Sequence, residues 1–220
     1  MKKLKVIDEQ FVRDIIILCN TYHGGENMSV GLAKGQKLSL TKGDPGRKEI
    51  VIALGWDVNA YDTGAAFDLD ASAFLLGADG KVSDSRDFVF YGNLEHESGS
   101  VIHPEINPAG EGGGDDAHII VNLGLVPESV LRIAFTASIY DAEIRQQTFG
   151  QVSHAYIRIF DSITREEILR YNLADNFTVE TAIVFGEIYN NNGEWKFNAM
   201  GNGYVGGLAG LCGIYGVEVG

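Results

Sequence analysis

The sequence predicts an all-β protein, a β-sandwich of two mainly antiparallel sheets with short peripheral helices. From residue 28 onward, short segments rich in β-branched and aromatic residues alternate with clusters of turn residues, a spacing typical of sandwiches. The 28 glycines against only 4 prolines favour many tight turns. The sequence offers no long amphipathic helix that could cover a parallel sheet, so the α/β classes are excluded.

Ten segments fit strands of this series, because each is rich in residues that favour a pleated, half-buried surface. In chain order they span residues 36–41, 49–56, 67–76, 87–93, 117–123, 131–142, 153–161, 166–173, 181–191 and 194–201. Residues 190–193, with the sequence NNNG, separate the last two and predict a hairpin turn, since Asn and Gly accept the positive φ angles that such turns require. Short helices are expected at residues 127–130 and 207–216.

Residues 28–220 are expected to form one domain, because all-β domains of this size are commonly single. The first 27 residues differ in character from the rest. The stretch GGENM at residues 24–28 can be encoded by a purine-rich ribosome-binding sequence just ahead of an ATG, so we expect translation to start at Met28 and residues 1–27 to lie outside the fold. The alternative is an amphipathic N-terminal helix, with Phe11, Ile15 and Leu18 on one stripe.

Composition narrows the class of protein. Lysine and arginine number 17 against 30 aspartates and glutamates, a net charge of -13 that argues against binding nucleic acid. Cys19 and Cys212 make no disulfide framework, which fits a reducing cytoplasm. No apolar run approaches the length of a membrane span, and Asp8 and Glu9 interrupt any signal-peptide core. A cytoplasmic location is therefore expected.

Residues 67–76, FDLDASAFLL, pose an electrostatic problem. Strand residues two apart share a face, so Asp68 and Asp70 lie on one side, before that face turns apolar again at Phe74 and Leu76. At about 6.6 Å apart and an effective dielectric near 20, their repulsion costs about 2.5 kcal/mol. A bound cation would relieve it, and Arg or Lys partners are the alternative. The pattern is not an EF-hand, which needs a glycine and a glutamate that are absent here.

Two further acidic stretches, GWDVN and GEGGGDD, strengthen the case for a metal. The first contains Asp57, and the second places Asp115 and Asp116 after glycines that free the backbone. Calcium takes six to eight oxygens at about 2.3 to 2.6 Å, and main-chain carbonyls of a glycine-rich loop can join the carboxylates. The ordinary alternative is an acidic loop that water alone solvates.

Enzymatic motifs are weak. The sequence has no G-x-S-x-G elbow and no phosphate loop, and its five histidines are scattered without metal-ligand spacing. A carboxylate pair such as Asp57 with Asp68 could serve a hydrolase, but only within a substrate groove. The aromatic residues fit a sandwich core, although carbohydrate-binding modules also expose Trp and Tyr. A lectin-like calcium module and, more weakly, a carboxylate-based hydrolase stay open as alternatives.

A series of motifs runs in order from Met28 to the C-terminus and includes GLAKGQKLSLTK, ALGWDVN, FDLDASAFLL, DFVFYGN, GEGGGDD, ETAIVFGEIY, GEWKF and GNGYVGGL. In order and spacing these motifs resemble the TerD family of tellurium-resistance and general stress proteins. The resemblance implies a cytoplasmic, calcium-binding β-sandwich without enzymatic activity that takes part in tellurite resistance and stress response. The implied partners are other Ter-type stress proteins and a membrane-associated partner complex, without nucleic-acid binding or direct membrane insertion.

The resemblance also implies a set of calcium ligands. Carried over by position, they are Asp57, Asp68, Asp70, Asn93, Asp115, Asp116, Asp141 and Glu187. This chain departs from the family pattern at Ile106, Ala109 and Ala117, where the family usually has oxygen-bearing residues. Because calcium affinity follows ligand charge, we expect one Ca²⁺ site near Asp68 and Asp70 to be intact and a second to be weakened.

Overall fold

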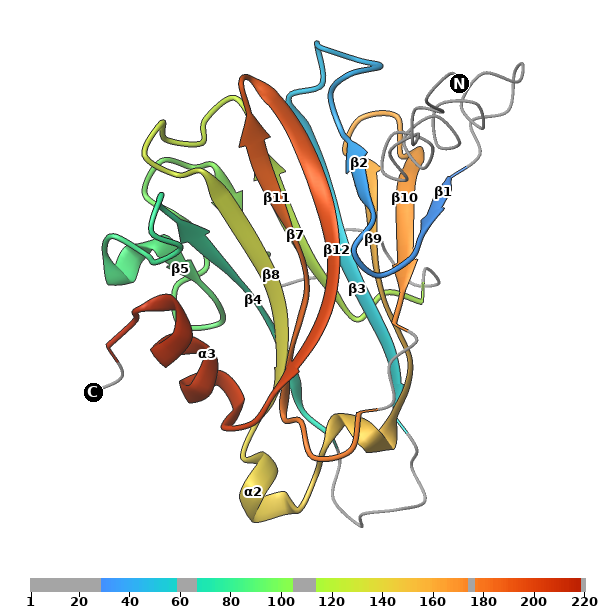
Figure 1. Cartoon of the computed structure of the whole chain (residues 1–220), viewed down its shortest axis with the longest axis vertical. Helices are drawn as coiled ribbons and strands as arrows, with labels where there is room; N and C mark the ends of the chain where they lie inside the picture. The colour runs from blue at the N-terminus through green and yellow to red at the C-terminus, as the bar shows by residue number, and fades with distance from the viewer. Residues whose placement is uncertain (1–28, 59–66, 105–113, 174–176, 219–220) are drawn as a thin grey trace, which may run out of the picture.

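The computed structural model describes residues 29–58, 67–104, 114–173 and 177–218, which form two β-sheets packed face to face (Figure 1). The predicted all-β sandwich is confirmed. Residues 1–27, for which we expect an upstream start or an amphipathic helix, lie outside the described residues. Within the described residues, no helix is both long and apolar enough to span a membrane.

The first sheet has the strand order β1-β10-β9-β3-β7-β6. Its strands are β1 (Val30–Leu32), β3 (Glu49–Val58), β6 (Val101–Ile102), β7 (Ala117–Asn122), β9 (Val152–Asp161) and β10 (Glu167–Asn172). Strand β1 pairs with β10 in parallel, and the other neighbours are antiparallel. The first sheet is therefore antiparallel except at one edge.

The second sheet has the order β2-β12-β11-β8-β4-β5 and is antiparallel throughout. Its strands are β2 (Lys37–Ser39), β4 (Leu69–Leu76), β5 (Phe88–Val89), β8 (Arg132–Ile139), β11 (Ala182–Asn191) and β12 (Glu194–Tyr204). Asn192 and Gly193 join β11 to β12 with φ angles of 55° and 87°. The predicted hairpin is confirmed, since a two-residue turn of this kind requires both angles to be positive.

Alternate residues of the two sheets fill the space between them. The inward side chains are Ile50, Ile52 and Leu54 on β3, and Ala71, Ala73 and Leu75 on β4. All are buried. Burying a large aliphatic side chain contributes about 1.5–3 kcal/mol, so this core supplies much of the stability.

A C-terminal helix, α3 (Gly207–Tyr215), covers part of the outer face of the second sheet (Figure 1). It confirms the helix predicted at residues 207–216. Leu211 and Tyr215 pack there with Phe74 and Leu76 of β4, and the rings of Phe74 and Tyr215 lie 4.6 Å apart. This packing explains why the outward face of β4 becomes apolar at Phe74.

Other local predictions need correction. The helix predicted at residues 127–130 is wrong: these residues form a turn, in which the Val130 N–H donates to the Pro127 carbonyl over 2.9 Å. The strand predicted at 87–93 is reduced to β5, because the chain turns back between Phe90 and Asn93. A one-turn helix, α2 (Ala142–Arg145), and two 3-10 helices, η1 (Ser85–Asp87) and η2 (Phe149–Gln151), were not predicted.

One end of the sandwich, at the bottom of Figure 1, is where β3 and β8 finish and β4 and β9 begin. Strand β7 begins further up, with Ala117 opposite Leu54 of β3. The strand registers agree with this arrangement, since Asp57 of β3 pairs with Ser153 of β9, and Leu69 of β4 with Ile139 of β8. We call this the acidic end, because Asp57, Asp68, Asp70, Asp115, Asp116 and Asp141 lie on or beside these strand ends.

Candidate functional site

The acidic end contains two separate groups of carboxylates, one on each sheet. Asp57 and Asp116 belong to the first sheet: Asp57 lies in β3, where it pairs with Ser153, and Asp116 directly precedes β7. Asp68 and Asp70 belong to the second, on the face of β4 that also presents Phe74. The fold therefore divides these four carboxylates between the two sheets.

In the first group, Asp116 is fixed by the backbone of β3. Its Oδ2 accepts a hydrogen bond from the Trp56 N–H over 2.7 Å, and its own N–H donates to the Leu54 carbonyl over 2.8 Å. Burial raises the pKa of Asp116, and the negative charges of Asp57 and Asp115 raise it further. The hydrogen bond from the Trp56 N–H lowers the pKa but does not offset these effects. The first group thus concentrates negative charge that the fold only partly offsets.

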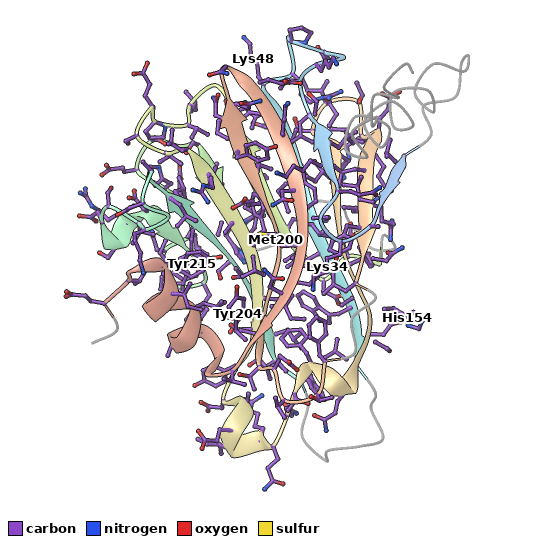
Figure 2. All side chains as sticks on the ribbon, in the orientation of Figure 1. Lys34, Lys48, His154, Met200, Tyr204 and Tyr215 are labelled. Atoms are coloured by element: carbon purple, nitrogen blue, oxygen red, sulfur yellow. The ribbon has the colours of Figure 1, made fainter. Side chains whose placement is uncertain are left out.

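Asp57 lies beside Asp116 and is largely exposed. Its Oδ2 is 2.9 Å from His154 Nδ1, and His154 projects outward into solvent (Figure 2). A contact between two exposed side chains contributes little, because solvent screens it. The Asp57 carboxylate therefore remains accessible to a cation.

Asp115, although adjacent in sequence, has a different environment. Its Oδ1 accepts from Tyr156 Oη over 2.7 Å and Arg158 Nε over 2.9 Å, while Oδ2 lies 2.5 Å from Arg158 Nη2 and 3.0 Å from His118 Nε2. Its side chain is fully buried. Burial alone would raise the pKa of Asp115, but the bonds from His118, Arg158 and Tyr156 outweigh it and hold the pKa well below its usual range. The protein itself supplies the cation here.

Tyr156 reaches Asp115 because residue 55 is glycine. A Cβ at Gly55 would lie 2.2 Å from Cζ of the Tyr156 ring, so the ring rests directly on β3. The guanidinium of Arg170 lies over the ring, 4.2 Å from its centroid. Burial, followed by the bond to Asp115, raises the pKa of Tyr156 to about 12, which keeps the hydroxyl protonated as a donor. With Gly55 and Arg170 against the ring, Tyr156 presents no open aromatic platform for a sugar.

In the second group, Asp68 and Asp70 share a face, as the alternation predicts. Burial raises the pKa of Asp70, and the charge of Asp68 raises it further, while His103 lowers it. Asp68 is 58% exposed, and its Oδ2 is 4.0 Å from Arg145 Nη2. Solvent therefore screens the two carboxylates. The repulsion between Asp68 and Asp70 lies nearer to the about 0.6 kcal/mol expected in water than to the about 2.5 kcal/mol expected at an effective dielectric near 20.

Asp141 joins the second group through the backbone. The Tyr140 N–H donates to the Asp68 carbonyl over 2.8 Å, which brings the residue after Tyr140 close to β4. Asp141 itself adopts a left-handed conformation, with φ 49° and ψ 34°, directly before α2. Aspartate is among the few non-glycine residues that tolerate this region, so the sequence and the local geometry agree.

Asn93 and Glu187, the other two predicted ligands, lie elsewhere. Asn93 Nδ2 donates to the carbonyls of Phe88 and Arg86 over 2.7 and 3.2 Å, which stabilises the turn after β5. Glu187 lies midway along β11, where its Oε1 is 3.4 Å from Asn198 Nδ2. The fold does not bring either residue to the acidic groups.

The carboxylate oxygens are of the kind that calcium prefers, but each group supplies fewer of them than calcium takes. Among the residues that the structure describes, no three His, Cys, Asp or Glu side chains converge on one point. Each group offers two or three carboxylates, fewer oxygens than calcium takes, so water and carbonyl oxygens would have to complete a site. Ile106 and Ala109, where the sequence departs from the family, lie outside the described residues.

The residues around Asp115 were missed by the sequence analysis. Arg158, Tyr156 and His118 come from β9 and β7, and a usable signal was present in the alternation of YIRIF, which sets Tyr156 and Arg158 on one face. This alternation does not show which strand Tyr156 and Arg158 will face. Only the register of β3 between β7 and β9 places Arg158 and His118 on either side of Ala53.

Asp87, His96 and Ser98 are hydrogen-bonded in the order of a hydrolytic triad, but their role is structural. His96 Nε2 is 3.0 Å from Asp87 Oδ1, and Nδ1 is 2.7 Å from Ser98 Oγ. The histidine is buried, and Asp87 also accepts from the Ser83 hydroxyl and N–H. A nucleophile must be accessible to substrate, whereas these bonds close the loop between η1 and β6.

Known proteins share both the sequence and the fold. Residues 28–215 match the family model described as the TerD domain. General stress protein 16U of Bacillus subtilis (strain 168) is 53% identical over 193 residues, which cover 88% of this chain and 100% of the relative. Tellurium resistance protein TerD of Serratia marcescens is 50% identical over 191 residues, covering 87% of this chain and 99% of the relative.

A solved structure is similar in fold. It is the crystal structure of a homologue of telluride resistance protein (TerD) from Streptomyces coelicolor A3(2), with a TM-score of 0.56 and 22% identity. The match covers 74% of this chain and 94% of that chain. At this identity the similarity supports the shared sandwich fold alone.

Proposed function

The chain belongs to the TerD family, and on this premise we propose that it is a cytoplasmic, calcium-binding protein of tellurite resistance and general stress response. Relatives named for stress response and for tellurium resistance share about half of its residues over nearly nine-tenths of its length. The protein acts without catalysis, through calcium-dependent association with other Ter-type stress proteins and a membrane-associated partner.

The observation that supports calcium binding is the unmet charge of Asp70 and Asp116. Burial and a neighbouring carboxylate raise the pKa of each. Neither forms an ion pair with any side chain that the structure describes. A divalent cation is the species that these carboxylates lack, because opposite charge favours their ionised form.

Two calcium positions follow from the division between the sheets. Asp57 and Asp116 would contribute to one ion, and Asp68 and Asp70 to the other, with water and carbonyl oxygens completing each site. Asp115 would act as a positioning residue, since Arg158, Tyr156 and His118 already satisfy its oxygens and fix the backbone just before Asp116. The position at Asp116 is the weaker one, because Asp115 is committed to Arg158 and Ala117 offers no side-chain oxygen.

Titration calorimetry with calcium tests this proposal. We expect two unequal sites in the wild-type protein, with Asp70→Asn abolishing the tighter and Asp116→Asn the weaker. Glu128→Gln, an exposed acid on the turn between β7 and β8 at the opposite end, is the matched control and should retain both. Calcium at a hundred times its dissociation constant should add about 2.7 kcal/mol of stability. An unchanged melting temperature in calcium and in EGTA would refute calcium binding.

A further inference from the structure

Four large apolar side chains are exposed at the acidic end. They are Tyr140 (46%), Ile144 (83%), Val179 (61%) and Val205 (63%). Exposed apolar side chains that gather beside charged ones are typical of protein interaction sites. Their position in one region of the fold is therefore the feature to establish.

Backbone hydrogen bonds hold the three segments that present them side by side. The Ile139 N–H donates to the Thr181 carbonyl over 3.0 Å, and the Thr181 N–H donates to the Tyr204 carbonyl over 2.8 Å. Tyr140 and Ile144 follow the first of these strands, Val179 precedes the second and Val205 follows the third. The four side chains therefore belong to one end of the second sheet.

The most exposed of the four is also held in a defined position. Ile144 lies on α2, and the residues on either side of this one-turn helix, Asp141 and Gln146, both have left-handed backbones. The N–H of Gln147 donates to the Ala142 carbonyl over 2.9 Å, and Ala142 is buried. A segment whose backbone is already fixed loses less conformational entropy on binding than a free one.

The charges around this surface define the chemistry of its partner. Asp141 follows Tyr140 and Glu143 precedes Ile144 along the chain, and the Asp68 carbonyl accepts from the Tyr140 N–H. The guanidinium of Arg145 already lies over the Tyr140 ring, 5.2 Å from its centroid. The whole chain carries a net charge of -13. Such a surface attracts cationic partners and repels anionic lipids and nucleic acids.

We propose that Tyr140, Ile144, Val179 and Val205 form a docking surface for a basic, amphipathic segment of a partner protein. The apolar side of that segment covers these four residues, and its lysines or arginines face Asp68, Asp141 and Glu143. An amphipathic helix laid on an apolar surface is a common mode of peptide recognition. The inference rests on the partner association proposed above and specifies which residues make it.

A synthetic helical peptide of leucine and lysine, with separate apolar and basic faces, is the probe. Its binding to the full chain is measured by fluorescence anisotropy in the presence of calcium, the condition in which the association is proposed, against a scrambled peptide of the same composition. The double variant Ile144→Ser with Val179→Ser should weaken binding by about tenfold or more, because it removes apolar contacts and leaves every charge in place. Glu143→Lys should weaken it as well.

Ile163→Ser is the matched control. Ile163 is 87% exposed, but it lies in the turn between β9 and β10, at the opposite end of the sandwich. Its replacement should leave peptide binding unchanged. Deuterium exchange on the wild-type protein gives a second measurement, in which the peptide should protect residues 139–145.

Several results would overturn the docking surface. Equal affinity for the scrambled peptide, equal losses in the double variant and in Ile163→Ser, or protection confined to other segments would each do so. Calcium titration of the same proteins separates this inference from the proposed function. Normal calcium binding without peptide binding removes the docking surface alone, and peptide binding without calcium binding removes the calcium proposal alone.

Discussion

Arg158 binds Asp115 through two of its nitrogens, with Nε 2.9 Å from Oδ1 and Nη2 2.5 Å from Oδ2. Arg158 Nη1 also donates to Glu167 over 3.1 Å. Paired hydrogen bonds of this kind are among the stronger polar contacts in proteins. The contact joins the segment beside the candidate calcium ligand Asp116 to β9 and β10.

Replacing Asp115 should destabilise the protein strongly. Asp115→Asn removes the charge that compensates a largely buried guanidinium, and breaking such a pair from one side costs about 3–5 kcal/mol. Urea denaturation measures the loss. Asp44→Asn is the matched control, because the half-exposed Asp44 lies 3.8 Å from Arg47, and a surface pair contributes less than about 1 kcal/mol. Losses of equal size in the two variants would contradict the assigned role of Asp115.

The same pair should give the protein a specific sensitivity to acid. The pKa of Asp115 is lowered in the folded state from a reference value of 3.8, so the folded state binds fewer protons at this residue. The stabilisation is complete above about pH 5 and is lost as the pH falls through the lowered pKa. The free-energy difference between wild type and Asp115→Asn should therefore shrink between about pH 5 and pH 2. A constant difference over that range would disprove this linkage.

Gly55→Ala should displace the Tyr156 ring. Its Cβ would lie 2.2 Å from a ring atom, a clash that forces Tyr156 away from Asp115 and costs about 1–3 kcal/mol. Thermal unfolding of the single variant, and of the pair with Tyr156→Ala, measures the effect. In the Tyr156→Ala background the alanine should cost less, because the clash is gone.

Gly31→Ala provides the comparison for that experiment. Gly31 also lies in a strand of the first sheet, but nothing is within 4 Å of a Cβ built there. Alanine at Gly31 should therefore be neutral or slightly stabilising. A destabilisation equal to that of Gly55→Ala would mean that strand glycines matter for a reason other than Tyr156.

Asp70→Asn should have opposite effects with and without calcium. In the calcium-free protein, burial and Asp68 disfavour the ionised Asp70 carboxylate, so its neutralisation should stabilise by less than about 1 kcal/mol. This gain should disappear as the pH falls and Asp70 becomes protonated in the wild type. With calcium present, the variant should lose the ligand-induced rise in melting temperature. A variant that melts below wild type in EGTA would contradict the repulsion.

Features that depend on a few neighbouring residues could be predicted from the sequence. The alternation of residues 67–76 correctly predicts that Asp68, Asp70 and Phe74 share a face of β4, because side-chain direction in a strand depends on the residues themselves. The NNNG hairpin was predicted for the same kind of reason. Both features depend on backbone preferences within a few residues.

Features that depend on pairing between distant segments could not be predicted from the sequence. Arg158 and Asp115 are 43 residues apart in sequence and meet through the register of β3 with two neighbours. The parallel pairing of β1 with β10 has no local signature either. The division of the acids between two sheets follows from strand order, which spacing along the chain does not encode.

The position of Ser29 gives the Arg158 contacts a wider reach. Its hydroxyl donates to Glu167 Oε1 over 2.5 Å, and Glu167 in turn receives Arg158. Asp115 is thus connected, through Arg158 and then Glu167, to Ser29 at the start of the parallel edge strand β1. Neutralising Asp115 should free Arg158 and weaken the contacts that hold Ser29 and β1 at the edge of the first sheet. Faster hydrogen exchange in β1 would then report, from a distance, on a change in charge beside Asp116.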